Sequence, residues 1–220
     1  TSIGRFAFSH CSGPTSVEIP NSVTTIGESA FSYCGRLTSV TIPNSVTNIG
    51  ENAFWSCDNL TSVHINDIDA WCRISFDDDN ANPLHYANNL YIGGDLVTNL
   101  VIPNSVTSIR KYAFYGCECL VSLTIPKSVT NIGYDAFGGC EKLEYFNFPE
   151  SLLSISGRAF YNCYSLKKIT IPENITKINE KSFYNCSEIT EIELPDALVE
   201  IGDSAFNECK ELETVTIHNG

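Results

Sequence analysis

Apolar and polar residues recur along this chain at a fixed spacing of 23 positions. The unit that begins at Ile26 reads Ile-Gly-x-x-Ala-Phe-x-x-Cys-x-x-Leu-x-x-Val-x-Ile-Pro-x-Ser-Val-Thr-x, and Ile49 begins the next one. The first isoleucine of the unit occurs at positions 3, 26, 49, 109, 132, 155, 178 and 201. A unit this short cannot bury its own apolar face, so the period predicts a solenoid in which neighbouring units stack.

Each unit contains two short segments with strand character. In the first, Val40 and Ile42 alternate with small polar residues. Because side chains alternate between the two faces of a strand, the aliphatic side chains should all point inward. Pro43 has no N–H for a sheet ladder, so the strand should end there. The second segment, 45–49, is again β-branched and alternating. Gly50 then predicts a turn with a backbone geometry that residues with a side chain disfavour. Residues 51–57 predict one short helical turn, which packing against the core must stabilise.

Stacking in register should bring equivalent side chains into ladders. One ladder is aromatic, and a cysteine follows each of its members by three positions. The phenylalanines are at 8, 31, 54, 114, 137, 160, 183 and 206, and the cysteines are at 11, 34, 57, 117, 140, 163, 186 and 209. We predict a leucine-rich-repeat solenoid, mostly β with some α+β character, in which about nine units form a curved right-handed superhelix. Residues 1–220 should form a single domain.

The repeat is interrupted at residues 66–98, within the long step from Ile49 to Ile109. We interpret this stretch as one repeat, enlarged by about 14 residues, that keeps the stack continuous. Its pattern predicts a short helix at 67–74, a polar loop at 77–83 and a hairpin at 91–96 through two glycines. The stretch is either a structural bulge or a loop that binds a partner.

Composition excludes some classes of function. The net charge of −13 and pI near 4.6 weigh against nucleic acid and anionic lipid, because phosphate binding needs clustered Lys and Arg. No apolar run approaches the roughly 20 residues that a membrane span needs, so we expect no direct membrane insertion. The chain has no Met and both starts and stops partway through a repeat. We therefore expect a piece of a longer protein, whose oligomeric state stays open.

The run Ala-Phe-x-x-Cys-x-x-Leu-x-x-Val-x-Ile-Pro resembles the BspA-like leucine-rich repeat, also called the Treponema-type repeat. The resemblance covers residues 1–65 and about 99–220. It implies a secreted or cell-surface protein of a host-associated bacterium or a protozoan parasite, with a role in adhesion to host matrix or to other cells. The family also has similar Trp-Cys and Asn-Pro-Leu interruptions, which favours a structural bulge at 66–98. The resemblance implies a binding module for protein or glycan, and a passive spacer for another domain is the alternative.

Ten cysteines and four histidines are the residues that could carry chemistry. Eight of the cysteines share one repeat position, so we predict buried free thiols rather than catalytic groups. A bridge between Cys72 and Cys119, which lie off the ladder, is an open hypothesis. The histidines, at 10, 64, 85 and 218, are scattered, and the acidic loop 77–82 misses the EF-hand spacing. A nucleophilic pair of Cys72 and His85 lacks an orienting third group. We expect no metal, no cofactor and no enzymatic activity.

A partner would contact the outward-facing residues of the first strands. Most of these residues are Ser or Thr, the ordinary composition of a solvated β surface. The exceptions gather on three consecutive strands in the C-terminal half and bring together an aromatic ring, a cation and carboxylates, as protein interfaces do. The candidate partner-binding residues are Tyr145, Asn147, Lys168, Glu191, Glu193 and, separately, His64. The alternative is neutral variation of surface positions.

Overall fold

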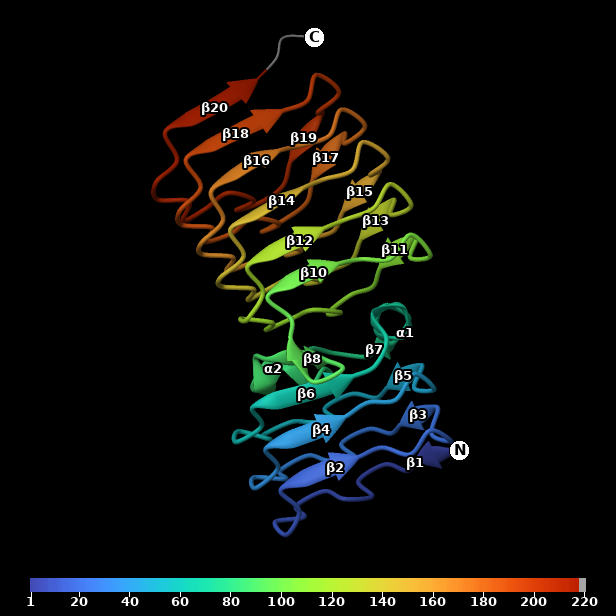
Figure 1. Cartoon of the computed structure of the whole chain (residues 1–220). Coiled ribbons are helices and arrows are strands. Elements are labelled where there is room, and N and C mark those ends of the chain that lie inside the picture. Colours follow the sequence, from blue (N-terminus) through green and yellow to red (C-terminus); the bar gives the residue numbers. More distant parts are fainter. Residues whose placement is uncertain (218–220) are drawn as a thin grey trace. The chain divides into compact units, whose positions relative to one another are not determined.

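The structure, a computed structural model, describes residues 1–217. The chain is a β-solenoid of about nine turns with repeats of about 23 residues, mostly strand with little helix, as the sequence predicts (Figure 1). It forms two compact units. The N-terminal unit comprises Thr1–Val97 and Tyr112–Cys119, and the C-terminal unit comprises Thr98–Lys111 and Leu120–Gly220. The curvature of the superhelix and the single-domain organisation stay predictions.

Both predicted strands of each repeat form, and they build two parallel ladders in register. In the N-terminal unit the first ladder contains β2 (Ser16–Glu18), β4 (Ser39–Thr41), β6 (Ser62–Ile65) and β8 (Leu90–Ile92), and the second contains β1 (Ser2–Ile3), β3 (Thr25–Ile26), β5 (Asn48–Ile49) and β7 (Ser75–Phe76). In the C-terminal unit the first-strand series is β10 (Asn99–Val101), β12 (Ser122–Thr124), β14 (Tyr145–Asn147), β16 (Lys168–Thr170), β18 (Glu191–Leu194) and β20 (Thr214–Ile217). Its second-strand series is β11 (Ser108–Ile109), β13 (Asn131–Ile132), β15 (Ser154–Ile155), β17 (Lys177–Ile178) and β19 (Glu200–Ile201).

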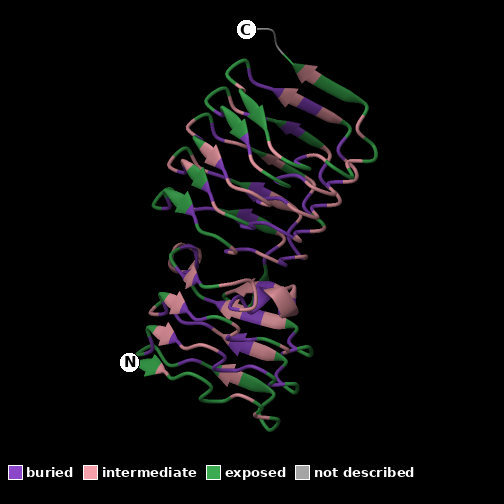
Figure 2. Ribbon diagram, turned by 180° about the vertical axis from the view of Figure 1, so that it is seen from behind, coloured by how far each residue is buried: buried purple, intermediate pink, exposed green. Residues whose placement is uncertain are grey.

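The core of each unit lies between the ladders, where the ribbon of Figure 2 is mostly purple. The phenylalanine ladder is its main component. The rings of Phe160 and Phe183 stack 5.5 Å apart at 3°, and those of Phe183 and Phe206 stack 5.4 Å apart at 4°. In the N-terminal unit Phe31 stacks on Phe54 at 5.4 Å. In these pairs each ring packs against the equivalent ring of the next repeat, as the period predicts.

The third segment of the repeat is a run of consecutive turns, and the predicted helical turn is wrong. Asn52 and Ser56 have φ of 56° and 55°, which a right-handed helix does not allow. The N–H groups of Ala53, Trp55 and Cys57 each bond the carbonyl three residues earlier. In the preceding repeat the N–H of Phe31 bonds the carbonyl of Ala53, 2.8 Å away. The segment thus forms a third set of backbone bonds between repeats instead of bonding only within itself.

The recurrent glycine is required by close packing of backbone, not by the turn geometry that the sequence suggested. Gly50 does not have a positive φ. A Cβ on Gly50 would lie 2.7 Å from the backbone nitrogen of Glu28 in the preceding repeat, and one on Gly133 would lie 2.5 Å from that of Lys111. Glycine therefore lets neighbouring repeats approach at this point.

The ten cysteines are all free, as predicted, and eight of them are buried. Ladder thiols donate to the phenylalanine carbonyl of the preceding repeat: the Sγ of Cys57 lies 3.2 Å from the oxygen of Phe31, and that of Cys186 lies 3.2 Å from that of Phe160. The hypothesis of a bridge between Cys72 and Cys119 is wrong. The neighbour of Cys119 is Cys117, with the two sulfurs 3.6 Å apart.

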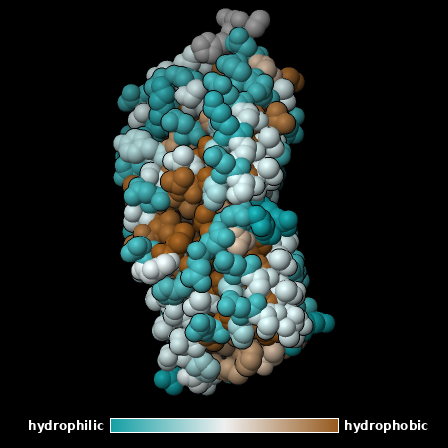
Figure 3. Space-filling model, turned by 45° about the vertical axis from the view of Figure 1, so that its right-hand side comes forward, coloured by the Kyte–Doolittle hydropathy of each residue, from teal (hydrophilic) through white to brown (hydrophobic). Residues whose placement is uncertain are grey.

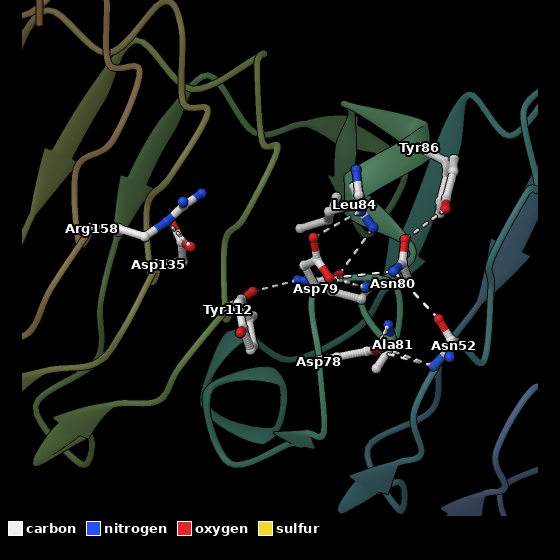
Figure 4. Close-up of polar contacts among 12 residues, drawn as sticks. Asn52, Asp78, Asp79, Asn80, Ala81, Leu84, Tyr86, Tyr112, Asp135 and Arg158 are labelled. Atoms are coloured by element: carbon white, nitrogen blue, oxygen red, sulfur yellow. Dashed lines mark hydrogen bonds and ion pairs between the residues drawn. The ribbon is translucent and has the colours of Figure 1, made fainter. Parts of the chain in front are cut away.

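The enlarged repeat contains the predicted helix, α1 (Ile68–Cys72), and the predicted hairpin, formed by β8 and β9 (Asp95–Leu96). A second helix, α2 (Leu84–Ala87), was not expected. Asp78 accepts from the backbone N–H of Asn52 at 3.1 Å and of Ala81 at 2.7 Å, so the acidic loop ties the enlarged repeat to its neighbour (Figure 4). The Asn82 amide donates to the carbonyl of Tyr112 at 2.6 Å. These contacts give the loop a structural role.

The parallel ladders of the N-terminal unit end at the enlarged repeat. β8 pairs with β6 on one edge and with β9, in antiparallel fashion, on the other. The hairpin therefore occupies the edge of β8 on which the next parallel strand would form. β10 begins a separate sheet with β12 and β14.

Candidate functional site on the strand face of the C-terminal unit

The outward residues of the first strands lie where the alternation predicts. In the register of the C-terminal unit, Tyr145 pairs with Ser122, and Lys168 pairs with Glu191. The residues that alternate with these along the strands, such as Ile169 and Ile192, point inward and are buried. Tyr145 is 60% exposed, which is unusual for a side chain of its size on this face. Five of the six candidate residues thus lie on β14, β16 and β18.

Both ladders of the C-terminal unit are interrupted at one level. β14 pairs with β12 but not with β16, and β15 pairs with β13 but not with β17. Among the described residues, no backbone hydrogen bond joins 145–148 to 168–171, or 153–156 to 176–179. At the base of the strands the N–H of Lys167 still reaches the carbonyl of Glu144, at 3.3 Å. The two repeats are therefore separated along their strands but remain joined below them.

Two aromatic residues account for the separation. Phe146 and Phe148 stand where other repeats have aliphatic residues such as Val40 and Ile42. The Phe146 ring stacks on Phe160 of the next repeat, 4.7 Å away at 8°, and Phe148 contacts both rings edge-on. Adding volume inside a packed core forces the backbone to move. The rings therefore hold β14 and β16 apart.

Two asparagines bridge neighbouring repeats on the side of the second strands, at the level where the ladders are interrupted. Asn174 stands where other repeats have a serine that bonds the repeat before it, and its amide donates to the carbonyl of Glu150 at 2.7 Å. Asn179 stands at the glycine position, and its amide donates to the carbonyl of Ile155 at 2.7 Å. In other repeats the backbone N–H makes this second bond, as from Gly202 to Ile178. Longer side chains thus span the wider spacing.

The separation leaves a hollow of about 420 Å³ on the strand face. It is lined by Leu123, Tyr145, Phe146, Asn147, Lys168 and Thr170. Phe146 is half-buried, whereas the inward residues at its position in β12 and β16 are buried, so its ring is reached through the hollow. The volume is in the range of small-molecule sites, and apolar and polar groups meet in it.

The polar side of the hollow is an ion-paired group. The Lys168 ammonium lies 2.9 Å from a Glu193 oxygen and 3.2 Å from a Glu191 oxygen. The Thr170 hydroxyl donates to the other Glu193 oxygen at 2.8 Å. The hydrogen bonds to Glu193 and Glu191 raise the pKa of Lys168, so it stays charged near neutral pH. One cation and two carboxylates leave this rim with one negative charge in excess.

His64 does not belong to this cluster. It lies on β6 in the N-terminal unit, where its ring stacks on Tyr91 at 4.9 Å. A role for His64 in binding stays a prediction. Sequence reasoning missed Phe146, Leu123 and Thr170 as lining residues. The replacement of two aliphatic residues by phenylalanine was the signal that could have revealed them.

The groups that suggested other chemistry are committed to the fold. Burial raises the pKa of the Cys57 and Cys72 thiols to about 12, so neither is an activated nucleophile. Burial lowers the pKa of His85, whose Nδ1 lies 3.9 Å from an Asp79 oxygen. Within residues 1–217, no three His, Cys, Asp or Glu side chains are grouped as metal ligands. His218 lies outside the described residues.

The surface and the helices add two observations. The face in Figure 3 is covered mainly by hydrophilic and neutral side chains, and its apolar side chains gather in restricted areas. Neither helix in the described part of the chain is long and apolar enough to cross a bilayer.

Comparison with known proteins places the chain in a family. The model of the BspA type leucine-rich repeat region matches residues 1–91 and 87–213. The chain belongs to this family. A leucine-rich cell surface protein from Faecalibacterium prausnitzii A2-165 shares 31% identity over 98% of this chain, with a TM-score of 0.68. The chain spans 56% of that protein's length.

A more distant protein shares the fold. The pneumococcal vaccine antigen PcpA is 16% identical over 98% of this chain and 73% of its own, with a TM-score of 0.56. A leucine-rich repeat protein of T. pallidum is 23% identical over 96% of this chain and 82% of its own, with a TM-score of 0.49. Among curated proteins, none matches the sequence.

Proposed function

We propose that this chain is a non-enzymatic binding module of a secreted or cell-surface protein, and that it mediates adhesion by binding a protein or a glycan. The observation that carries the proposal is the hollow on the strand face, around which Tyr145, Asn147 and Lys168 gather. Glu191 and Glu193 complete its rim through their ion pairs with Lys168. Exposed aromatic rings beside charged groups are typical of interfaces.

Family membership supports the surface location. The F. prausnitzii relative is a cell surface protein that matches nearly the whole of this chain. Solenoids of stacked repeats present extended faces that suit binding. Buried thiols with raised pKa values and a histidine with a lowered one offer no activated nucleophile or base, which agrees with a module that does not catalyse.

The test is binding to arrays of host matrix proteins and of glycans. The wild-type chain is compared with a triple variant, Tyr145→Ala, Lys168→Ala and Glu191→Ala, and with a control in the N-terminal unit, Tyr91→Ala. We expect a ligand that the control retains and the triple variant loses, with thermal stability of all three proteins within a few degrees. A ligand that the triple variant retains would contradict this site.

A passive spacer is the second candidate. Most outward residues on the N-terminal strand face are Ser and Thr, and the chain spans 56% of the length of its F. prausnitzii relative, so specificity could lie in another part of the protein. The absence of any ligand for the wild-type chain on both arrays would favour the spacer.

A further inference from the structure

We infer that the hollow between β14 and β16 is a subsite for one uncharged pyranose ring of a glycan. This inference rests on the proposed function and names the ligand class of the same site. Three properties of the hollow carry it: an apolar surface beside an exposed aromatic ring, unpaired backbone groups on both walls, and a rim whose one cation is already held by two carboxylates.

The apolar surface suits one face of a sugar ring. Tyr145 is 60% exposed, and the half-buried Phe146 and the buried Leu123 line the hollow beside it. A pyranose has C–H groups that pack on an aromatic face, whose quadrupole is negative, and a rim of hydroxyls. Tyr145 offers the ring face, and Asn147 and Thr170 offer polar groups close by.

The backbone on both walls favours a ligand that donates and accepts hydrogen bonds. Because β14 and β16 do not pair, N–H and C=O groups that pair between β10 and β12 and between β16 and β18 have no backbone partner across this gap among the described residues. A hydroxyl group is both donor and acceptor, so a sugar can serve both kinds of backbone group. An apolar side chain of a protein partner would leave them unpaired, at a cost of about 1–3 kcal/mol for each buried group. The backbone therefore favours a sugar over such a side chain.

The rim argues against a charged sugar. Lys168, the cation that lines the hollow, is held by both Glu193 and Glu191. An acidic sugar would have to compete with two carboxylates for one ammonium and would approach a chain with a net charge of −13. A neutral hexose or an N-acetylhexosamine meets no such repulsion. The size of the hollow, about 420 Å³, suits a small ring system rather than a folded surface.

Replacing the two phenylalanines, Phe146 and Phe148, gives the most specific variant for the test. Phe146→Val with Phe148→Ile restores the aliphatic pair of other repeats, such as Val40 and Ile42, and leaves Tyr145, Asn147 and Lys168 in place. We expect β14 and β16 to pair in this variant. Slower amide exchange at position 148, whose counterparts Ile42 and Ile102 donate to the next strand, would report the closed ladder.

Binding is measured by saturation-transfer difference NMR on the full chain. The probes are the neutral methyl glycosides of glucose, galactose, mannose, N-acetylglucosamine and N-acetylgalactosamine, each at millimolar concentration, with sialyllactose as the acidic arm. We expect transfer to at least one neutral glycoside, a loss of affinity of roughly tenfold or more in Tyr145→Ala and in the closed-ladder variant, and no change in Tyr91→Ala. The control residue Tyr91 is a half-exposed strand-face tyrosine in the N-terminal unit.

The outcomes separate this inference from the proposed function. No transfer to any neutral glycoside, transfer that persists in Tyr145→Ala, or a preference for sialyllactose would overturn the sugar subsite. The proposed function would still stand if a matrix protein bound the chain and the triple variant lost it. That result would identify the hollow as a pocket for a protein side chain.

Discussion

Removing one ring from the phenylalanine ladder should destabilise the fold locally and strongly. Phe183 is fully buried and stacks on Phe160 at 5.5 Å and on Phe206 at 5.4 Å. Phe183→Ala removes packing on both faces and leaves a cavity between two rigid neighbours. Substitutions of this kind cost about 3–5 kcal/mol, and the ladder has little freedom to collapse, so we expect the upper part of the range.

Phe8→Ala is the matched control. Phe8 is 45% exposed and stacks on Phe31 at 5.3 Å. Full burial of such a side chain contributes about 1.5–3 kcal/mol, so the half-exposed ring should contribute about 1 kcal/mol. Urea titrations followed by circular dichroism would give both free energies of unfolding. Equal losses in the two variants would refute the reasoning that burial within the ladder determines the contribution of each ring.

Amide hydrogen exchange would show where Phe183→Ala acts. In a stacked-repeat fold each repeat contacts only its neighbours, so stability is close to a sum of local terms. Protection should fall at the N–H groups of Phe160 and Phe183, which bond the carbonyls of Ser182 and Ala205. Protection around Phe31 in the N-terminal unit should not change. A uniform loss along the chain would contradict the local picture.

Three further predictions concern the backbone and the thiols. Gly50→Ala should destabilise by about 1–3 kcal/mol because its Cβ would lie 2.7 Å from the nitrogen of Glu28, whereas Gly35→Ala meets no atom within 4 Å and should be close to neutral in thermal melts. Asn179→Gly, although it restores the usual residue, should cost about 1 kcal/mol in urea because it removes the bond to Ile155. Burial raises the pKa of the Cys57 thiol to about 12 in the folded chain, against 9.0 ordinarily. The contribution of this thiol to the free energy of unfolding is therefore full below pH 9.0 and is lost as the pH rises toward 12. Cys57→Ala should flatten the decline of unfolding free energy between these pH values.

The strands and the aromatic ladder were predictable from the sequence because one alternation per repeat determines both. Val40 and Ile42 must face inward if the polar residues between them face water, and stacking then aligns every phenylalanine. The turn segment was not predictable from apolar spacing, since Ala53, Phe54 and Cys57 also fit one face of a helix. A better signal lay in the equivalents of Ser56, which include Gly116 and Asn162, residue types that tolerate a positive φ.

The five clustered candidate residues followed from the same alternation, but the hollow between them did not. Phe146 and Phe148 are visible in the sequence as substitutions, yet their volume could have been accommodated by shifting the core. The structure shows instead that Phe146 lies over Phe160 and that the strands separate. That outcome depends on the direction of one ring and on whether the neighbouring repeat can move. Neither is encoded in a periodic pattern.

A strongly periodic chain offers its own criterion for locating a site. Neutral drift would place departures from the repeat independently of one another along the stack. Here, departures of three kinds coincide near one level: Phe146 and Phe148 lie at the interrupted strands, Asn174 and Asn179 bridge neighbouring repeats there, and Tyr145 and Lys168 change the exposed face. In other repeats a serine hydroxyl and the glycine N–H make the equivalent contacts, so the longer asparagine side chains fit the separation. Their presence indicates that the open ladder is a stabilised feature of the fold, which is what a preformed binding site requires.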